Sequence, residues 1–307
     1  MLKIWRRARS WMWVVSHIVV MIGLAIGEVG DVVSGVDSLT YHSLQLKVER
    51  RLAGGLQFGA AYTYSRGRGL QGYDPYTEQL GGEEALRARY WGPTELDRPH
   101  NLVVHYSYMV PNPTPNTPIL KAVLGDWLVA GVTKFLSGAP VNPTCSSNNA
   151  GIANSDPTLT GLAAVTGEDE AARCMLTGES IDSGFTVDPD PAVAVHFNPD
   201  AFAMAQPVSA TEGNFGNAPL NMLRHPSWST WDLTLERRFP LRVLSPSANI
   251  RLQFQAYNLF NQVEFTELDA DFDFTGANNS IINSTDTGRY VDVIPPRILA
   301  LTLRVEF

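Results

Sequence analysis

The glycine-rich stretch Gly67-Arg-Gly-Leu-Gln-Gly72 fits the G-x-G-x-x-G pattern of dinucleotide-binding loops. Such a site needs a helix that begins at the loop and an acidic residue about 20 positions further on. Here Tyr73-Asp-Pro75 follows the glycines instead. The pattern therefore favours a flexible loop, and we predict no bound cofactor.

Asp269, Asp271 and Asp273 resemble the start of a calcium-binding loop, in which alternate positions supply oxygen ligands. Phe274 stands where that loop requires glycine, and Ser280 stands where it requires a bidentate glutamate. The prediction is a solvated acidic loop, with a weak surface calcium site as the alternative. The six histidines are scattered, without an H-E-x-x-H or a Cys/His zinc spacing, so we predict no resident metal.

The sequence gives no sign of an enzyme. It has no G-x-S-x-G motif, although a hydrolase whose Asp, His and Ser meet only after folding is an alternative that a linear sequence leaves open. A net charge of −8, with 18% charged residues, argues against nucleic-acid binding. Between Pro140 and His225, ten acidic residues stand against two arginines, which predicts an acidic loop that attracts cations and repels anions.

The two cysteines, Cys145 and Cys174, lie 29 positions apart in one long predicted loop. An even number of cysteines in an exported chain permits a disulfide. Closing such a loop stabilises a fold by about 3–4 kcal/mol. We predict a Cys145–Cys174 disulfide, with two free thiols as the alternative.

The element around which the chain is organised is its last stretch, 296–307. Its apolar row is Leu299, Leu301, Leu303, Val305 and Phe307, and its opposite row is Ala300, Thr302, Arg304 and Glu306. A period of two predicts a strand with one apolar face. An outward apolar row that ends in an aromatic residue is typical of transmembrane barrels. An edge strand of a soluble β protein is the alternative.

Seven segments are predicted as strands: 40–52, 55–66, 100–110, 126–137, 228–239, 248–261 and 299–307. The first six are about 11–14 residues long, which is twice the usual globular strand and close to the tilted length that spans a bilayer. All except 126–137 alternate clearly, with charged or amide side chains opposite bulky apolar ones. This pattern predicts one face in lipid and one in a wet lumen.

The connections alternate between short and long along the chain. The short ones are 53–54, 111–125 and 240–247, and the long ones are 67–99, 138–227 and 262–298. Outer-membrane barrels have short periplasmic turns and long outer loops. Loops above about 15 residues are uncommon in compact soluble domains. The alternation therefore predicts a membrane barrel whose C-terminus lies on the periplasmic side.

Residues 1–27 differ from the rest of the chain. Four basic residues precede an apolar run of 16 residues, Trp11–Ile26, and the first acidic residue is Glu28. The run is shorter than the ~20 residues of a transmembrane helix, and Ala25 and Gly27 offer a small-x-small cleavage site. A signal peptide or a membrane-anchoring hydrophobic helix is expected, followed by a barrel domain at 38–307. A wrongly chosen start codon upstream of a gene fragment is the third alternative, in which case the apolar run would not be a targeting or anchoring segment.

From Tyr41 to Phe307 the chain resembles the C-terminal part of the barrel of a TonB-dependent outer-membrane receptor, closest to the Oar-like group with a carboxypeptidase-regulatory-like domain. The stretches that carry the resemblance are YHSLQLKVERRLAGGLQFGAAYTYSR, LDRPHNLVVHYSYMVP, GDWLVAGVTKFLSGAPV, FNPDAFA, GNFGNAPLNMLRHPSWSTWDLTLERRF, LQFQAYNLFNQVEF and RILALTLRVEF. The implied fold is all-β, a partial transmembrane antiparallel barrel.

The resemblance implies energised nutrient uptake across the cell outer membrane. Its implied partners are outer-membrane lipid, the barrel-assembly machinery through the strand ending at Phe307, and the remaining strands and plug of a full-length receptor. We expect no plug or TonB box within this chain, and about seven strands against the ~22 of a plugged transporter. The alternative is a structural or adhesin-like outer-membrane barrel protein without transport activity. The sequence does not identify a solute.

Overall fold

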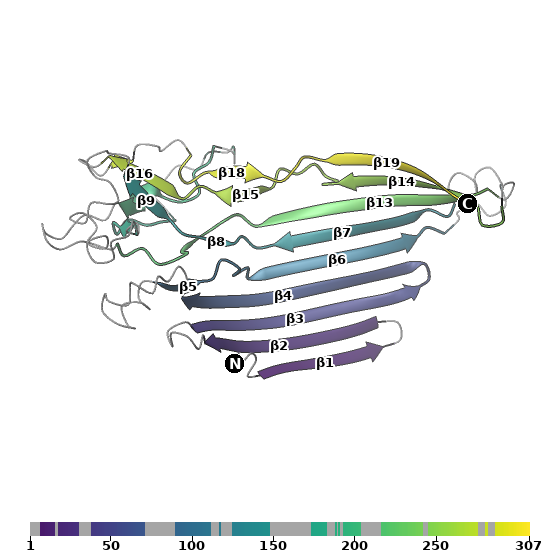
Figure 1. The fold of residues 1–307 in the computed structure, drawn as a ribbon, viewed down its shortest axis with the longest axis horizontal. Coiled ribbons are helices and arrows are strands. Elements are labelled where there is room, and N and C mark those ends of the chain that lie inside the picture. Colours follow the sequence, from purple (N-terminus) through teal and green to yellow (C-terminus); the bar gives the residue numbers. More distant parts are fainter. Residues whose placement is uncertain are drawn as a thin grey trace, which may run out of the picture.

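The computed structural model describes residues 7–15, 18–30, 38–70, 90–111, 117, 125–147, 173–182, 188, 190, 193–203, 216–241, 245–275, 280–281 and 286–307. Long strands lie side by side in one sheet, and short strands gather at one end of them (Figure 1). Within these residues, no helix is long and apolar enough to cross a membrane.

The main sheet is antiparallel throughout, with the order β1-β2-β3-β4-β6-β7-β13-β14-β19 and a short β5 beside β4. Its strands are β1 (Arg7–Val15), β2 (Ile18–Gly30), β3 (Ser38–Ala53), β4 (Leu56–Leu70), β5 (Trp91–Pro93), β6 (His100–Met109), β7 (Leu128–Leu136), β13 (Trp228–Pro240), β14 (Asn249–Tyr257) and β19 (Ile298–Glu306). All seven predicted strands are confirmed, including the poorly alternating β7. The all-β, partial antiparallel barrel is likewise confirmed, because no ladder among the described strands joins β1 to β19.

The described residues near the N-terminus differ from the expectation. The expected hydrophobic helix is wrong for 7–15 and 18–30, which form β1 and β2. Aromatic and β-branched residues make up nearly half of both stretches and favour strands. The register of β2 on β3 places Ile22 opposite Leu46 and Leu24 opposite Leu44, so the apolar row of β3 continues onto β2. Cleavage of a signal peptide stays a prediction.

Two other expectations change with these strands. The sheet path has nine long strands rather than about seven. As the first of seven predicted strands, 40–52 would lie at an edge of the sheet; this is wrong, because β3 lies between β2 and β4. The described strand at that end of the sheet is β1 instead.

The β3–β4 hairpin shows why the chain turns where it does. Ala53 pairs with Leu56, so Gly54 and Gly55 make a two-residue loop, with φ values of 62° and 81°. Two successive positive φ values match the mirror-image turns that suit the twist of a hairpin, and glycine adopts them without strain. A Cβ on Gly55 would also lie 2.9 Å from the Met109 carbonyl oxygen.

The short strands form a second body at the end of the sheet opposite the C-terminus (Figure 1), called here the cap. The cap consists of the described residues of 140–224 and 262–297. Its pairs are β8 (Pro140–Val141) with β12 (Leu223–Arg224), β9 (Thr144–Ser147) parallel to β16 (Asp271–Thr275), β16 with β17 (Ser280–Ile281), β10 (Met175–Leu176) with β11 (Phe202–Ala203), and β15 (Phe265–Leu268) with β18 (Tyr290–Val293). A 3-10 turn at Pro199–Ala201 precedes β11. Two long connections of the predicted barrel thus contribute to one folded cap.

Candidate functional site

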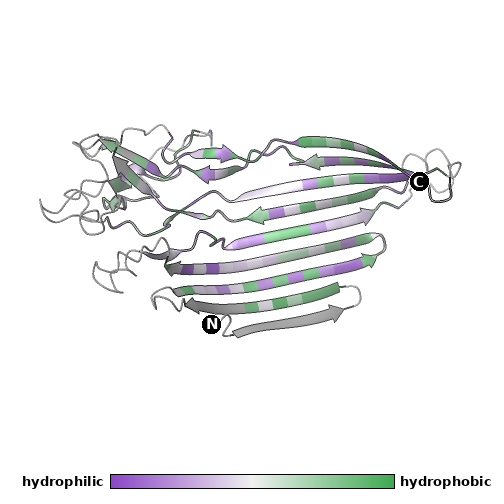
Figure 2. Ribbon diagram, viewed as in Figure 1, coloured by the Kyte–Doolittle hydropathy of each residue, from purple (hydrophilic) through white to green (hydrophobic). Residues whose placement is uncertain are grey.

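The long strands are two-faced. The register aligns apolar residues of neighbouring strands on one face, for example Ala256 with Leu299, Phe254 with Leu301, and Leu252 with Leu303. Hydrophobic and hydrophilic residues alternate along these strands (Figure 2). Leu301 and Leu303 are 70% and 66% exposed. A soluble protein rarely exposes an apolar face of this extent, whereas lipid covers such a face in a barrel.

Aromatic rings border the apolar face at its cap end. Trp231 makes edge-to-face contacts with Phe135 and Phe260, with ring centroids 5.7 and 5.6 Å apart. Nearby, the Tyr62 hydroxyl hydrogen-bonds His100 Nδ1 at 2.8 Å. Rings with an apolar body and a polar tip suit the boundary between lipid and water.

A second aromatic border lies at the other end of the strands. The Arg237 guanidinium lies over the rings of Phe239 and Trp127, at 4.7 and 5.6 Å from their centroids. Trp231 and Phe239 lie eight residues apart on the same face of β13, which is about 26 Å along a strand and about 20 Å after a tilt of about 40°. This height is close to the apolar band of about 25 Å in outer-membrane barrels.

The opposite face of the sheet carries charges. Glu236 accepts from Arg238 at 3.0 Å and lies 3.5 Å from Arg251, and Arg251 reaches Glu306 on β19 at 3.5 Å. On β3, Lys47 pairs with Glu49 at 2.7 Å. A charged network cannot face hydrocarbon without a large penalty, so this face suits a wet lumen.

A buried carboxylate fastens the sheet to the cap. Asp97 is 3% exposed and accepts from the Gly67 N–H at 2.8 Å and from Arg66 Nη1 at 3.3 Å. It also accepts from Arg224 Nη2, while Arg224 Nη1 donates to the Asp97 backbone oxygen at 2.8 Å. A buried charge persists only when it is paired and hydrogen-bonded. Asp97 therefore ties β4 and the segment after β5 to β12 of the cap.

The cap has an apolar core of its own. Phe202 packs against Phe272 in a tilted arrangement with ring centroids 4.9 Å apart, and Phe197 contacts both rings. Phe272 and Phe274 are fully buried. These rings come from two connections, 138–227 and 262–298, so the core holds the two connections together.

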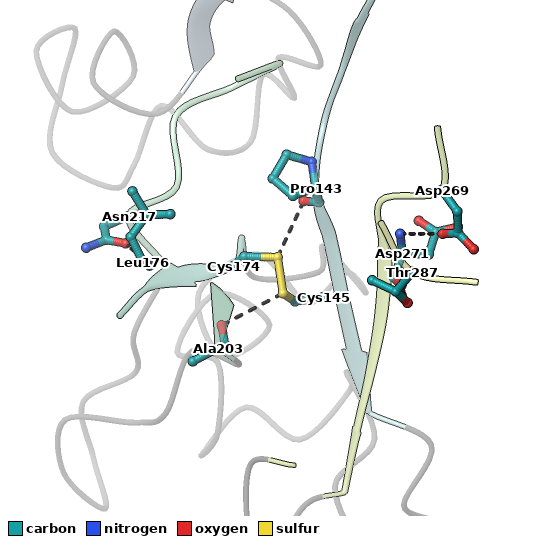
Figure 3. Close-up of a disulfide and its surroundings, with 9 residues drawn as sticks. All are labelled: Pro143, Cys145, Cys174, Leu176, Ala203, Asn217, Asp269, Asp271 and Thr287. Carbon is teal, nitrogen blue, oxygen red and sulfur yellow. Dashed lines mark hydrogen bonds between the residues drawn. A yellow bond between two sulfur atoms is a disulfide. The ribbon is translucent and has the colours of Figure 1, made fainter. Parts of the chain in front are cut away.

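A disulfide joins this core (Figure 3). The structure brings Cys145 of β9 and Cys174, next to β10, to a Cα–Cα distance of 5.2 Å. Both cysteines are buried among the core residues, and the sulfur of Cys174 lies 3.5 Å from the Pro143 carbonyl oxygen. The cross-link therefore sits inside packed structure, where it holds β9 against the β10–β11 pair.

His225 is a further tie, between the cap and the start of β13. Its side-chain Nδ1 accepts the Leu268 N–H at 2.9 Å, and the backbone N–H of His225 donates to the Ala139 carbonyl oxygen at 2.9 Å. Burial lowers the pKa of His225 below its ordinary value of 6.5, and the nearby Glu267 only partly opposes this effect. The lowered pKa favours the neutral ring, which an acceptor at Nδ1 requires.

Sequence reasoning missed Asp97, Arg224 and His225, because their partners are far away in the chain. Of the glycine motif, Gly67 and Gly69 lie in β4, and Gly72 lies outside the described residues. In the aspartate run, Asp269 accepts the Asp271 N–H at 2.9 Å. Among the residues that the structure describes, no three His, Cys, Asp or Glu side chains are grouped to hold a metal ion.

Comparisons with known proteins add a family match. A profile described as "Outer membrane beta barrel domain" matches residues 21–292, which begins inside β2. The unliganded ferric citrate transporter FecA shows a weak structural similarity, with 12% identity and a TM-score of 0.41 over 97% of this chain and 30% of FecA. The chain thus spans less than a third of that protein's length. No curated protein matches the sequence.

Proposed function

Because the chain belongs to the outer membrane beta-barrel domain family, we propose that it forms part of the wall of a TonB-dependent receptor that imports a nutrient. Membership in this family implies an outer-membrane location. The receptor assignment, its Oar-like subgroup and the transport role rest on the sequence motifs that resemble such receptors, together with the geometry of the sheet.

The observation that carries the proposal is the two-faced sheet. Its apolar face is framed by aromatic rings at a spacing near the thickness of the apolar band, and its other face holds the network of Glu236, Arg251 and Glu306. A lipid-facing outside and a charged inside are the requirements of a wall around an aqueous path. The cap then lies on the outer side, and Phe307 on the periplasmic side.

The two edges of the sheet support a multi-part receptor. In the order β1 to β19, nine strands alternate in direction, so both edge strands run from the cap end to the opposite end. Each edge leaves roughly half of its backbone groups without a ladder, and each such group costs several kcal/mol in lipid. The sheet therefore needs neighbouring strands on both sides.

The direction of the edges constrains those neighbours. A second copy of the chain, inserted with the same orientation, offers edge strands that run the same way and could pair only in parallel. Antiparallel closure needs a neighbour at each edge that runs from the opposite end toward the cap end. The first and last of the added strands therefore run in the same direction, so the number of added strands is odd. Adding 13 to the nine long strands gives the ~22 of a plugged transporter. We propose that the other strands, and the plug, of a full-length receptor fill this role.

Assembly of the wall is proposed to begin at β19. Its last residue, Phe307, is 85% exposed at the end of an apolar row, where the barrel-assembly machinery can reach it. The lipid of the outer membrane is the partner of the apolar face.

A fractionation experiment tests the proposal. The chain should be recovered in the outer-membrane fraction, and protease added to intact cells should cut within 138–226 while leaving the long strands protected. Energised uptake should then require co-expression of the complementary strands and plug. Recovery in the soluble fraction, or protection of 138–226 on intact cells, would refute the proposed location and topology.

A second candidate is a structural or adhesin-like surface protein. The observation in its favour is the cap, which is a folded body with a disulfide and its own core rather than a set of open loops. A wall that is fully assembled with complementary strands but gives no solute uptake would favour this candidate.

A further inference from the structure

The polar face of the sheet carries a groove near the middle of the strands. It encloses about 400 Å³ and reaches from β4 to β14, a volume in the range of small-molecule sites. Its floor is formed by Ala130 and Val132 on β7. The register places Ala130 between Ser107 and Thr234, and Val132 between His105 and Asp232. Ala130 and Val132 carry shorter side chains than Gln57, His105 and Tyr257, which also line the groove, and this difference in length leaves room for the depression.

One wall of the groove is held in place by hydrogen bonds. Asp232 Oδ1 accepts the Asn258 N–H at 3.1 Å. Asn258 is in a left-handed conformation with φ 49°, and its side-chain amide donates to the Gln262 carbonyl oxygen and accepts the Gln262 N–H. The carboxylate of Asp232 is therefore oriented before any ligand arrives. Pre-oriented groups bind a ligand at a lower entropic cost.

Rings flank the groove on both sides. The His105 imidazole lies over Gly59, in the space that a Cβ at that position would need, so the absence of a side chain at Gly59 fixes where the ring lies. On the other side, Tyr257 follows Ala256, the partner of Leu233, and so lies beside Asp232 on the polar face. Tyr257 is 44% exposed and offers its ring and hydroxyl to the groove.

The chemistry of the lining selects one kind of solute. The polar groups are those of Gln57, His105, Ser107, Asp232, Thr234 and Tyr257, and no lysine or arginine is among the described residues that line the groove. An anion finds no cation to pair with, and an apolar solute would leave these groups without hydrogen bonds. A ligand with many hydroxyls satisfies both donors and acceptors, and its C–H faces can pack on the Tyr257 ring.

We propose that this groove binds a small, uncharged, polyhydroxylated solute of the sugar type. This inference rests on the proposed uptake function and names the class of solute that the wall would pass. The groove faces the lumen side of the sheet, where such a solute would travel.

The test uses the full chain refolded in detergent micelles, with saturation-transfer NMR as the readout. The probes are maltose, sucrose and raffinose, with glucuronate and citrate as anionic comparators. We expect transfer to at least one uncharged sugar and about tenfold less to the anions. Ala130→Trp, which fills the floor, should abolish transfer, and Val129→Trp, on the lipid-facing side of the same strand, should leave it unchanged. Asp232→Asn keeps an acceptor for Asn258 and should weaken binding about tenfold.

Circular dichroism establishes that each variant keeps its strand content, and Asp232→Asn decides the question if Ala130→Trp does not fold. Absence of transfer to all three sugars, preference for an anion, or equal loss in Val129→Trp would overturn the inference. The test does not depend on location or uptake. An outer-membrane chain that binds no sugar refutes only the groove, and sugar binding by a chain found outside the membrane refutes only the proposed function.

Discussion

Replacing Asp97 with asparagine should loosen the connection between the sheet and the cap. The substitution keeps the shape of the side chain but removes the charge that pairs with Arg66 and Arg224. It also places an amide N–H₂ where the carboxylate accepted from the arginine and Gly67 donors. Both effects leave buried or half-buried polar groups without suitable partners.

The magnitude follows from the exposure of the three side chains. The Asp97 side chain is 2% exposed, and those of Arg66 and Arg224 are 49% and 32% exposed. Breaking a fully buried ion pair costs about 3–5 kcal/mol. Since both arginines keep contact with water, which screens the lost interaction, we expect a smaller loss of about 2–3 kcal/mol for local opening.

Hydrogen exchange by mass spectrometry measures this loss locally. Protection of the Gly67 amide, which donates to Asp97, and of the 91–99 and 221–226 segments should fall about 30- to 150-fold, since each 1.4 kcal/mol is a factor of ten. Amides that pair β14 with β19 should not change. Asp182→Asn, an exposed acid of the cap, is the matched control and should be neutral.

Two results would refute this reasoning. Unchanged protection at Gly67 in Asp97→Asn would mean that the carboxylate does not hold the sheet to the cap. Equal loss of protection along β14 and β19 would mean that the substitution unfolds the whole sheet rather than the junction.

Three further predictions concern the cap and the last strand. Non-reducing peptide mapping should recover Cys145 and Cys174 as one linked pair, and Cys145→Ser should lower cap stability by about 3–4 kcal/mol in denaturant titrations; two free thiols in the mature protein would contradict this. The depressed pKa of His225 contributes stability that is complete above pH 6.5, its unfolded value, and is lost as the pH falls through the lower folded value. The protection factor of the Leu268 amide, which compares its exchange rate with the intrinsic rate at the same pH, should therefore fall in acid. His225→Ala should remove that pH step, and a step that persists would point to another group. Phe307→Ala should reduce recovery in the outer membrane several-fold, whereas Phe260→Ala, at the opposite border, should not. Equal recovery of Phe307→Ala and the unmodified chain would mean that Phe307 has no role in assembly.

The strands with a regular alternation could be predicted from the sequence because each has one apolar face, and a one-residue shift would turn that face around. The paired rows of Phe254 with Leu301 and Leu252 with Leu303 follow directly from this constraint. The first two strands could not be distinguished from a leader by this means. Their apolar residues occur on both faces, and a continuous apolar run does not separate a strand from a helix.

The cap lies beyond prediction from a single sequence for a different reason. One of its pairs, β9 beside β16, brings together residues 127 positions apart (Asp271 and Thr144), and nothing local marks such a pair. The same holds for Asp97, whose partner Arg224 is 127 positions away. The cysteine pair was accessible from the sequence, because an exported chain with two cysteines offers one intramolecular pairing.

The most direct test of the account is the exposure pattern along β19 in outer-membrane fractions. Spin labels placed one at a time at Leu301, Thr302, Leu303 and Arg304 report access to oxygen, which partitions into lipid, and to a nickel chelate, which stays in water. The account predicts that labels at 301 and 303 meet oxygen and labels at 302 and 304 meet nickel, with a period of two. Equal access of nickel to all four positions would contradict a wall with one face in lipid.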